Sequence, residues 1–92
     1  MIKSFRSKGL RLFAETGSTA RLSVQNPARI RRILANLEAA MQPADMNLPG
    51  YRFHGLQGSE ESRFAVDASG NWRITFGWED GNAIDVDLED YH

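Results

Sequence analysis

The residue types best able to do chemistry in this chain are its two histidines. His54 lies in the segment RFHGLQG, and His92 ends the stretch AIDVDLEDYH that begins at Ala83. Histidine can both give and take a proton near neutral pH. Together with Asp90, Tyr91 and several arginines, the two histidines suggest acid–base catalysis on a phosphodiester.

The length and composition of the chain limit what can position these residues. Ninety-two residues predict a single small domain spanning residues 1–92, and 41% hydrophobic with 25% charged residues is an ordinary globular balance. No apolar run approaches the length of a membrane span, and residues 1–13 lack the apolar stretch of a signal peptide, so we expect a cytoplasmic protein. Because the chain contains no cysteine, disulfides and thiolate metal sites are excluded.

The first helix is expected close to the N-terminus. Ile2–Phe5 is half apolar and is predicted to form a first or edge strand. The segment Ser7–Thr16 that follows carries apolar residues at helical spacing. Gly17 comes directly after it and suits a left-handed helix terminus.

The second helix has the clearest pattern in the chain. Asn26 can cap it, Pro27 suits its first position, and Pro43 is expected to close it. Arg29 and Arg32 fall beside its apolar stripe, so the solvent side of the helix is predicted to be basic. The stripe itself consists of Ile30, Ile33, Leu34, Leu37 and Met41.

After the turn at residues 47–50 the apolar pattern changes to a period of two, which is typical of strands. The expected strands are residues 51–56, 62–67, 72–78 and 84–88, with hairpin turns at 68–71 and 79–82. A strand, two helices and an antiparallel meander give an α+β domain with the helices packed on one sheet face. In the last two strands the even-numbered residues should face the helices. The open face should then carry Arg63, Arg73, Asp85, Asp87, Glu89 and Tyr91.

The charge of the chain is unevenly distributed along it. The net charge is −1, but residues 1–32 contain eight basic residues and one acid, Glu15, whereas residues 79–92 contain six acids and no lysine or arginine. Such a distribution indicates either a basic surface for a polyanion or pairing between helix and sheet. The second arrangement is the commoner one.

Four motifs in order carry a resemblance to a known family: MIKSFRSKGL, MNLPGYRFHGLQG, GNWRITFGWEDGNAIDVD and the terminal DYH. Over nearly its whole length the chain resembles the HigB-like killer toxins of the RelE/ParE superfamily. The resemblance implies a bacterial type II toxin with a microbial-ribonuclease-like fold that cuts messenger RNA on the translating ribosome, without metal or cofactor. The implied partners are a HigA-like helix-turn-helix antitoxin, the ribosome and messenger RNA, with no membrane.

The resemblance also points to individual residues. In the family, the histidine and the lysine of an HxLKG segment and a terminal Asp-Tyr-His are tied to activity. His54, Asp90, Tyr91 and His92 match these positions. Gln57 stands where the lysine would be, so the cation expected beside the scissile phosphate is missing.

The implied reaction needs a base for a ribose 2′-OH, positive charge on the phosphate, and an acid for the departing 5′-oxygen. His54 and His92 can each fill the base or the acid role, and the sequence does not decide between them. Arg73 is expected to bind the phosphate, because a guanidinium matches two phosphate oxygens at once. A cross-strand pair with Asp85 or Asp87 is the alternative for Arg73.

Supporting roles are assigned on weaker grounds. Tyr91 is expected to stack on a base or to bind phosphate, and Asp90 to orient a histidine. Contacts with messenger or ribosomal RNA are expected from Arg29, Arg32, Arg52, Gln57 and Arg63. The acidic run at residues 85–90 contains alternate carboxylates that suit a hard cation, but a solvated or arginine-paired face is favoured because no calcium-type loop surrounds it.

Three other functions remain open on the sequence. A ParE-like toxin that poisons DNA gyrase would not depend on His54 or His92. A degenerate toxin that only binds its antitoxin is consistent with Gln57. A nucleic-acid-binding module without chemistry would depend instead on the basic face of Arg29 and Arg32.

Overall fold

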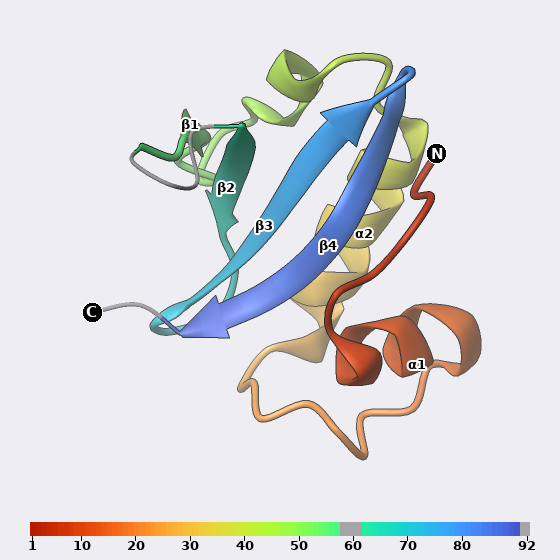
Figure 1. Cartoon of the computed structure of the whole chain (residues 1–92). Helices are drawn as coiled ribbons and strands as arrows, with labels where there is room; N and C mark the ends of the chain where they lie inside the picture. The colour runs from red at the N-terminus through yellow and green to blue at the C-terminus, as the bar shows by residue number, and fades with distance from the viewer. Residues whose placement is uncertain (58–61, 91–92) are drawn as a thin grey trace.

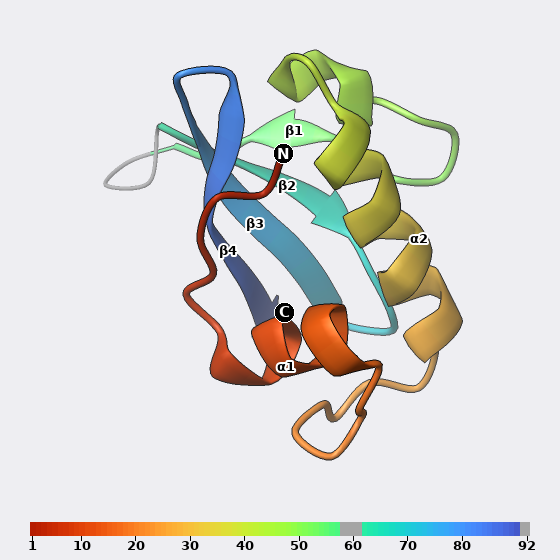
Figure 2. The same ribbon diagram turned by 90° about the vertical axis from the view of Figure 1, so that its right-hand side faces the viewer.

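The computed structural model describes residues 1–57 and 62–90 (Figure 1). Its elements are α1 (Lys8–Thr16), α2 (Pro27–Ala39), the 3₁₀ helix η1 (Pro43–Met46), β1 (His54–Gly55), β2 (Arg63–Asp67), β3 (Trp72–Glu79) and β4 (Asn82–Asp90). The strands form an antiparallel sheet in the order β1-β2-β3-β4, and the two α-helices lie on one side of it (Figure 2). The predicted α+β class and the antiparallel meander are confirmed.

Both α-helices begin at a capping side chain, and the Asn26 cap of α2 is the one expected from the sequence. The Ser7 side chain accepts a hydrogen bond from the Leu10 amide at 3.1 Å, and the Asn26 side chain accepts one from the Arg29 amide at 3.2 Å. Gly17 ends α1 in the left-handed conformation, with φ 78°. No helix in the described part of the chain is long and apolar enough to cross a membrane.

The hydrophobic core lies between the two α-helices and the sheet. Fully buried side chains from both layers form it, among them Leu10, Ile30, Ile33, Leu37, Val66, Ile74, Phe76 and Val86. Each such side chain contributes roughly 1.5–3 kcal/mol through removal of its apolar surface from water. The core therefore holds the helices against one sheet face and leaves the opposite face for polar groups.

The second helix ends earlier than its apolar stripe predicted. Met41 is 82% exposed, whereas Met46 in η1 is fully buried. The amide of Met41 donates to Oδ2 of Asp45 at 2.8 Å, a hydrogen bond that holds the pKa of this carboxyl below its ordinary value. Met41 therefore lies beyond the end of α2 at Ala39, and its predicted place in the core is wrong. Pro43 begins η1, so the prediction that it closes α2 is also wrong.

The expected N-terminal strand does not form a continuous ladder. Residues 2–5 make two isolated parallel bridges to β4, one between Ile2 and Ala83 and one between Phe5 and Val86. Asp85 lies between these contacts on β4 with φ 49°, which interrupts the extended backbone. The segment borders β4 as Figure 1 shows, but the prediction of a regular strand is wrong.

A β-bulge at Asp85 also changes which residues of β4 face the helices. Thr75 pairs with Asp87, whereas Gly77 pairs with Ile84, so β4 contains one extra residue in between. Ala83 is fully buried in the core, and Ile84 lies opposite Gly77 on the other face. The predicted alternation therefore holds for residues 86–89 and is wrong at Ile84.

The strand predicted at residues 51–56 is reduced to His54–Gly55. Arg52 has φ 50°, and such a backbone cannot continue a strand. Tyr51 is buried beside it, and its hydroxyl accepts a hydrogen bond from Nδ2 of Asn36 at 2.8 Å. Burial of Tyr51 against α2 has overridden the strand pattern here.

Truncation of each methionine tests which of the two side chains, Met46 or Met41, lies in the core. We expect Met46→Ala to lower the free energy of unfolding by about 2–5 kcal/mol, because it leaves a cavity in the core. The matched variant Met41→Ala should change it by less than about 0.5 kcal/mol, since Met41 lies in solvent. Urea unfolding followed by circular dichroism measures both. Equal losses would contradict the placement of these two side chains.

Candidate functional site

Polar side chains gather on the sheet face that the helices leave open. Residues directly opposite each other on antiparallel strands share a face. One row across this face consists of His54, Ala65, Thr75 and Asp87, and the next of Asp67, Arg73 and Glu89. The register therefore places a predicted catalytic histidine and a predicted phosphate-binding arginine on the same side of the sheet.

A chain of hydrogen bonds connects three strands on this face. Nη2 of Arg63 donates to Oγ1 of Thr75 at 2.8 Å and to the Asp85 carbonyl at 2.9 Å. Thr75 in turn donates to Oε2 of Glu89 at 2.6 Å, and Arg73 lies 3.5 Å from the other oxygen of that carboxylate. Arg63 is only 7% exposed. These partners compensate for removing its charge from water.

Arg73 forms the kind of cross-strand pair that the sequence offered as an alternative, but with a different partner. The β3–β4 register puts Glu89 opposite Arg73, and not Asp85 or Asp87. Its side chain keeps 21% exposure. The ion pair with Glu89 restrains the orientation of the Arg73 guanidinium. Binding of a phosphate by Arg73 stays a prediction.

His54 is exposed on the short edge strand β1. Its Nδ1 lies 2.7 Å from the carbonyl oxygen of Arg52. A carbonyl oxygen can only accept, so the ring nitrogen donates in this hydrogen bond. The imidazole is thus both accessible to a substrate and oriented by the backbone just before it.

Two further residues predicted to contact RNA lie near His54 in solvent. Arg52 is 79% exposed and forms an ion pair of 3.5 Å with Asp67. Exposed pairs of this kind contribute about 0–1 kcal/mol, so Arg52 can exchange this partner easily. Gln57 is exposed just beyond β1.

The predicted basic face of α2 is divided by the structure. Arg32 is exposed as expected. The guanidinium of Arg29 instead lies over the ring of Tyr51, 5.2 Å from its centroid, and donates to the carbonyls of Gly50 at 2.7 Å and Asp67 at 3.1 Å. The expectation that Arg29 simply faces solvent is therefore wrong, because its side chain links α2 to the segment that leads to His54.

The described site residues do not form one cluster. Two strands lie between β1, which carries His54, and β4, which carries Asp90. At the usual strand spacing their backbones are about 14 Å apart. The register sets Asp90 opposite Trp72, on the face away from Arg73. Tyr91 and His92 lie outside the described residues.

The acidic run of β4 is dispersed rather than gathered. The amide of Asp85 donates to the hydroxyl of Ser4 at 2.8 Å, and Glu89 bonds to Thr75 and Arg73. Within residues 1–57 and 62–90, no three histidines, cysteines or carboxylates are grouped as metal ligands would be. The arginine-paired arrangement favoured from the sequence is thus present at Glu89.

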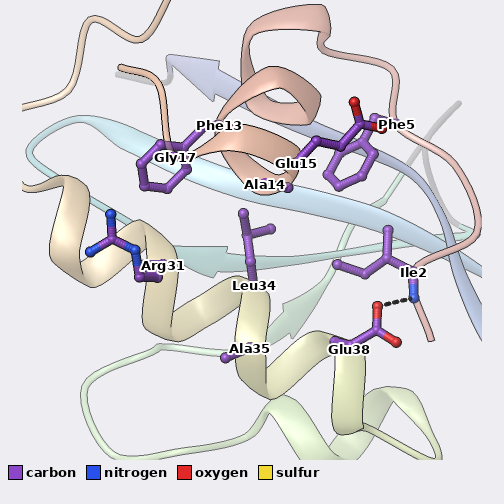
Figure 3. Close-up of a pocket in the computed structure, with 10 residues that line it drawn as sticks. All are labelled: Ile2, Phe5, Phe13, Ala14, Glu15, Gly17, Arg31, Leu34, Ala35 and Glu38. Atoms are coloured by element: carbon purple, nitrogen blue, oxygen red, sulfur yellow. Dashed lines mark hydrogen bonds between the residues drawn. The ribbon is translucent and has the colours of Figure 1, made fainter.

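Hollows lie on different parts of the surface of the described residues. A cavity of about 580 Å³ between α1, α2 and the N-terminal segment is lined mainly by apolar side chains, and the Ile2 amide donates to Glu38 at its rim (Figure 3). None of the predicted site residues that the structure describes lines it. A smaller hollow of about 280 Å³ lies on the open face of the sheet beside Arg63, Gly77 and Ile84.

Comparison with known proteins identifies the family. The family described as "RelE-like toxin of type II toxin-antitoxin system HigB" matches residues 3–92. This chain belongs to that family. Membership in a type II toxin family implies an antitoxin as partner.

Two curated proteins extend the likeness to nearly full length. The chain is 38% identical over 92 residues to Endoribonuclease HigB of Proteus vulgaris, a match that covers 100% of both chains. It is 31% identical over 93 residues to Toxin HigB-1 of Vibrio cholerae serotype O1, covering 97% of this chain and 96% of that protein. The resemblance inferred from the four motifs is confirmed.

Sequence reasoning missed Thr75 and Glu89 as the link between Arg63 and Arg73. Their signal was their odd-numbered positions on neighbouring strands, which put all four side chains on one face. What the pattern could not supply was the partner of each residue. That depends on the register, and the bulge shifts the register by one residue.

Removing the hydroxyl of Thr75 tests the link. We expect Thr75→Val to lower the free energy of unfolding by about 1–3 kcal/mol, because the buried donor of Arg63 and one oxygen of Glu89 lose their partner while side-chain volume is conserved. Thr19→Val, at an exposed position, is the control and should stay within about 0.5 kcal/mol of the parent. Thermal and urea unfolding measure the difference, and indistinguishable variants would show that the link contributes nothing.

Proposed function

We propose that this chain is the toxin of a type II toxin–antitoxin system and an endoribonuclease that cleaves messenger RNA on the translating ribosome. The family match over residues 3–92 and the likeness to a relative named an endoribonuclease support the proposal. The observation that carries it is the exposed imidazole of His54 on the same sheet face as the guanidinium of Arg73. A proton-transfer group and a cation are what phosphodiester cleavage requires.

The proposed reaction needs only the RNA itself and groups that transfer protons. One histidine takes the proton of a ribose 2′-OH, and the 2′-oxygen forms a bond to the adjacent phosphorus. The bond from phosphorus to the 5′-oxygen breaks, and the second histidine gives its proton to that oxygen. The products are a 2′,3′-cyclic phosphate and a 5′-hydroxyl end. His54 and His92 fill these two roles, and Arg73 offsets the negative charge that builds up on the phosphate.

Two residues at the end of the chain are assigned supporting roles in the proposal. Tyr91 stacks on a base or binds phosphate, and Asp90 orients a histidine. No metal or other cofactor has a role in this scheme.

The proposed partners are the ribosome with its messenger RNA and a HigA-like helix-turn-helix antitoxin, in the cytoplasm. Exposure of Arg32, Arg52 and Gln57 supports their assignment to RNA contact. Arg29 and Arg63 are assigned the same role, but both already bond to the protein, so an RNA contact by either would share or replace those hydrogen bonds.

One observation favours a second candidate function. Gln57 provides no charge at the position where a cation would lie beside the phosphate, which fits a degenerate toxin that retains only antitoxin binding. In that case the chain would bind its antitoxin without cleaving RNA. A gyrase-directed toxin is the third outcome that the experiments distinguish.

Brief expression in bacteria with mapping of messenger 5′ ends tests the proposal. New cuts within translated regions are expected for the parent chain, and His54→Ala and His92→Ala should each slow cleavage by about a hundredfold or more, the usual loss for an acid–base group. Gln25→Ala, at an exposed connector position, is the control and should cut like the parent. Growth arrest with intact messages would indicate gyrase instead, and no arrest would indicate the degenerate toxin.

Restoring the missing cation gives an independent check. We expect Gln57→Lys to raise the cleavage rate, since a lysine there would place positive charge near the phosphate. Gln25→Lys adds the same charge at a distant exposed position and controls for general attraction to RNA. Cleavage of a defined messenger on purified ribosomes measures both rates. An unchanged or lower rate for Gln57→Lys would refute the assigned role of position 57.

A further inference from the structure

The tautomer of His54 follows from its one hydrogen bond within the described residues. Nδ1 lies 2.7 Å from the Arg52 carbonyl, which can only accept, so the hydrogen of the neutral ring is on Nδ1. The lone pair is then on Nε2. That atom has no hydrogen-bond partner within residues 1–57 and 62–90, and the side chain is exposed.

The Arg52 carbonyl reaches this position through an unusual backbone conformation. Arg52 has φ 50°, in the left-handed region that residues other than glycine seldom adopt. Such a conformation is unfavourable and persists only where the surrounding structure imposes it. The acceptor of the histidine hydrogen bond is thus held in place at an energetic cost.

The residues on both sides of Arg52 impose the conformation. Tyr51 is buried, bonds to Asn36 through its hydroxyl, and accepts a hydrogen bond from the Asp67 amide at 2.7 Å through its carbonyl. Phe53 stacks on Phe64 with ring centroids 5.7 Å apart and an interplanar angle of 10°. With both neighbours fixed, Arg52 has little freedom to relax.

Arg29 completes this support from the helix layer. Its guanidinium donates to the carbonyl of Gly50, just before the segment, and to that of Asp67, at the end of β2, and it lies over the Tyr51 ring. The loop before His54 is therefore tied both to α2 and to the end of β2. Neither the side chain of Arg52 nor that of His54 is needed for these contacts.

We propose that Arg52 is a positioning residue whose left-handed backbone holds neutral His54 with its hydrogen on Nδ1, so that Nε2 is the atom that takes the substrate proton. This assignment rests on the proposed ribonuclease function and makes His54 the base of the reaction. The 2′-OH proton passes to Nε2, the 2′-oxygen bonds to phosphorus, and the 5′-oxygen leaves with a proton from His92.

The tautomer can be measured without any substrate. Long-range proton–nitrogen correlation spectra of the whole chain, labelled with ¹⁵N-histidine and recorded where the imidazole is neutral, distinguish hydrogen on Nδ1 from hydrogen on Nε2. Comparison with His54→Gln assigns the signals, because the chain has two histidines. We expect the Nδ1–H form to predominate at His54. Predominance of the Nε2–H form would overturn the proposal whatever the activity.

A matched pair of variants tests the backbone of Arg52 separately from its side chain. Arg52→Gly and Arg52→Val both lose the guanidinium and any contact it makes with RNA. Glycine adopts a positive φ readily, whereas a β-branched residue strongly disfavours it. We expect the glycine variant to keep the Nδ1–H signature and the valine variant to lose it.

Cleavage at saturating ribosome concentration should follow the same order. The valine variant should be slower than the glycine variant by about tenfold or more, part of the roughly hundredfold that a lost acid–base group costs. Equal rates and equal tautomers in the two variants would refute the role of Arg52. If the valine variant does not fold, the parent tautomer remains decisive. The expected tautomers without cleavage by the parent would support the positioning and refute the ribonuclease proposal.

Discussion

The single extra residue at Asp85 decides which side chains of β3 and β4 lie opposite each other. Without this bulge, counting back from the turn at residues 80–81 would put Arg73 opposite Leu88. With it, Arg73 lies opposite Glu89, and the polar residues of three strands reach one another on one face. Gly77 accommodates the shift, since a Cβ there would lie 3.1 Å from Ile84. The bulge also lies between the two contacts of the N-terminal segment with β4.

The second constraint acts across the layers of the domain. Arg29 reaches from α2 to the backbone at the start of the loop before His54 and at the end of β2. A basic residue that the sequence assigns to a solvated, RNA-binding face thus serves as a structural link as well. Packing of the helix on the covered face is in this way connected to the orientation of an imidazole on the open face.

The motifs that carry the family resemblance contain residues that form these contacts and the strained backbone at Arg52. The segment NLPG ends at Gly50, whose carbonyl Arg29 binds, and RFHGLQG begins at the strained Arg52. The segment NWRI brings Arg73 opposite Glu89. A small domain with a modest core can keep such strained or charged arrangements only where several contacts hold them together. On the open face, such contacts orient the His54 imidazole and the Arg73 guanidinium.

The sequence alone determined the class of fold, the Asn26 cap, the Gly17 helix terminus, the hairpin order and the family, because these depend on local chemistry and on spacing along the chain. It also placed Arg63, Arg73 and Glu89 on one face, since alternation in a strand is a local property. Only the tertiary structure decided which residues meet. Turn position and alternation disagreed in β4, and a bulge resolved the conflict. Tyr51 lies outside its predicted strand because it is buried and bonds to Asn36, fifteen residues away. Met41 lies outside the core because its amide bonds to Asp45 beyond the end of α2 and Met46 is buried instead.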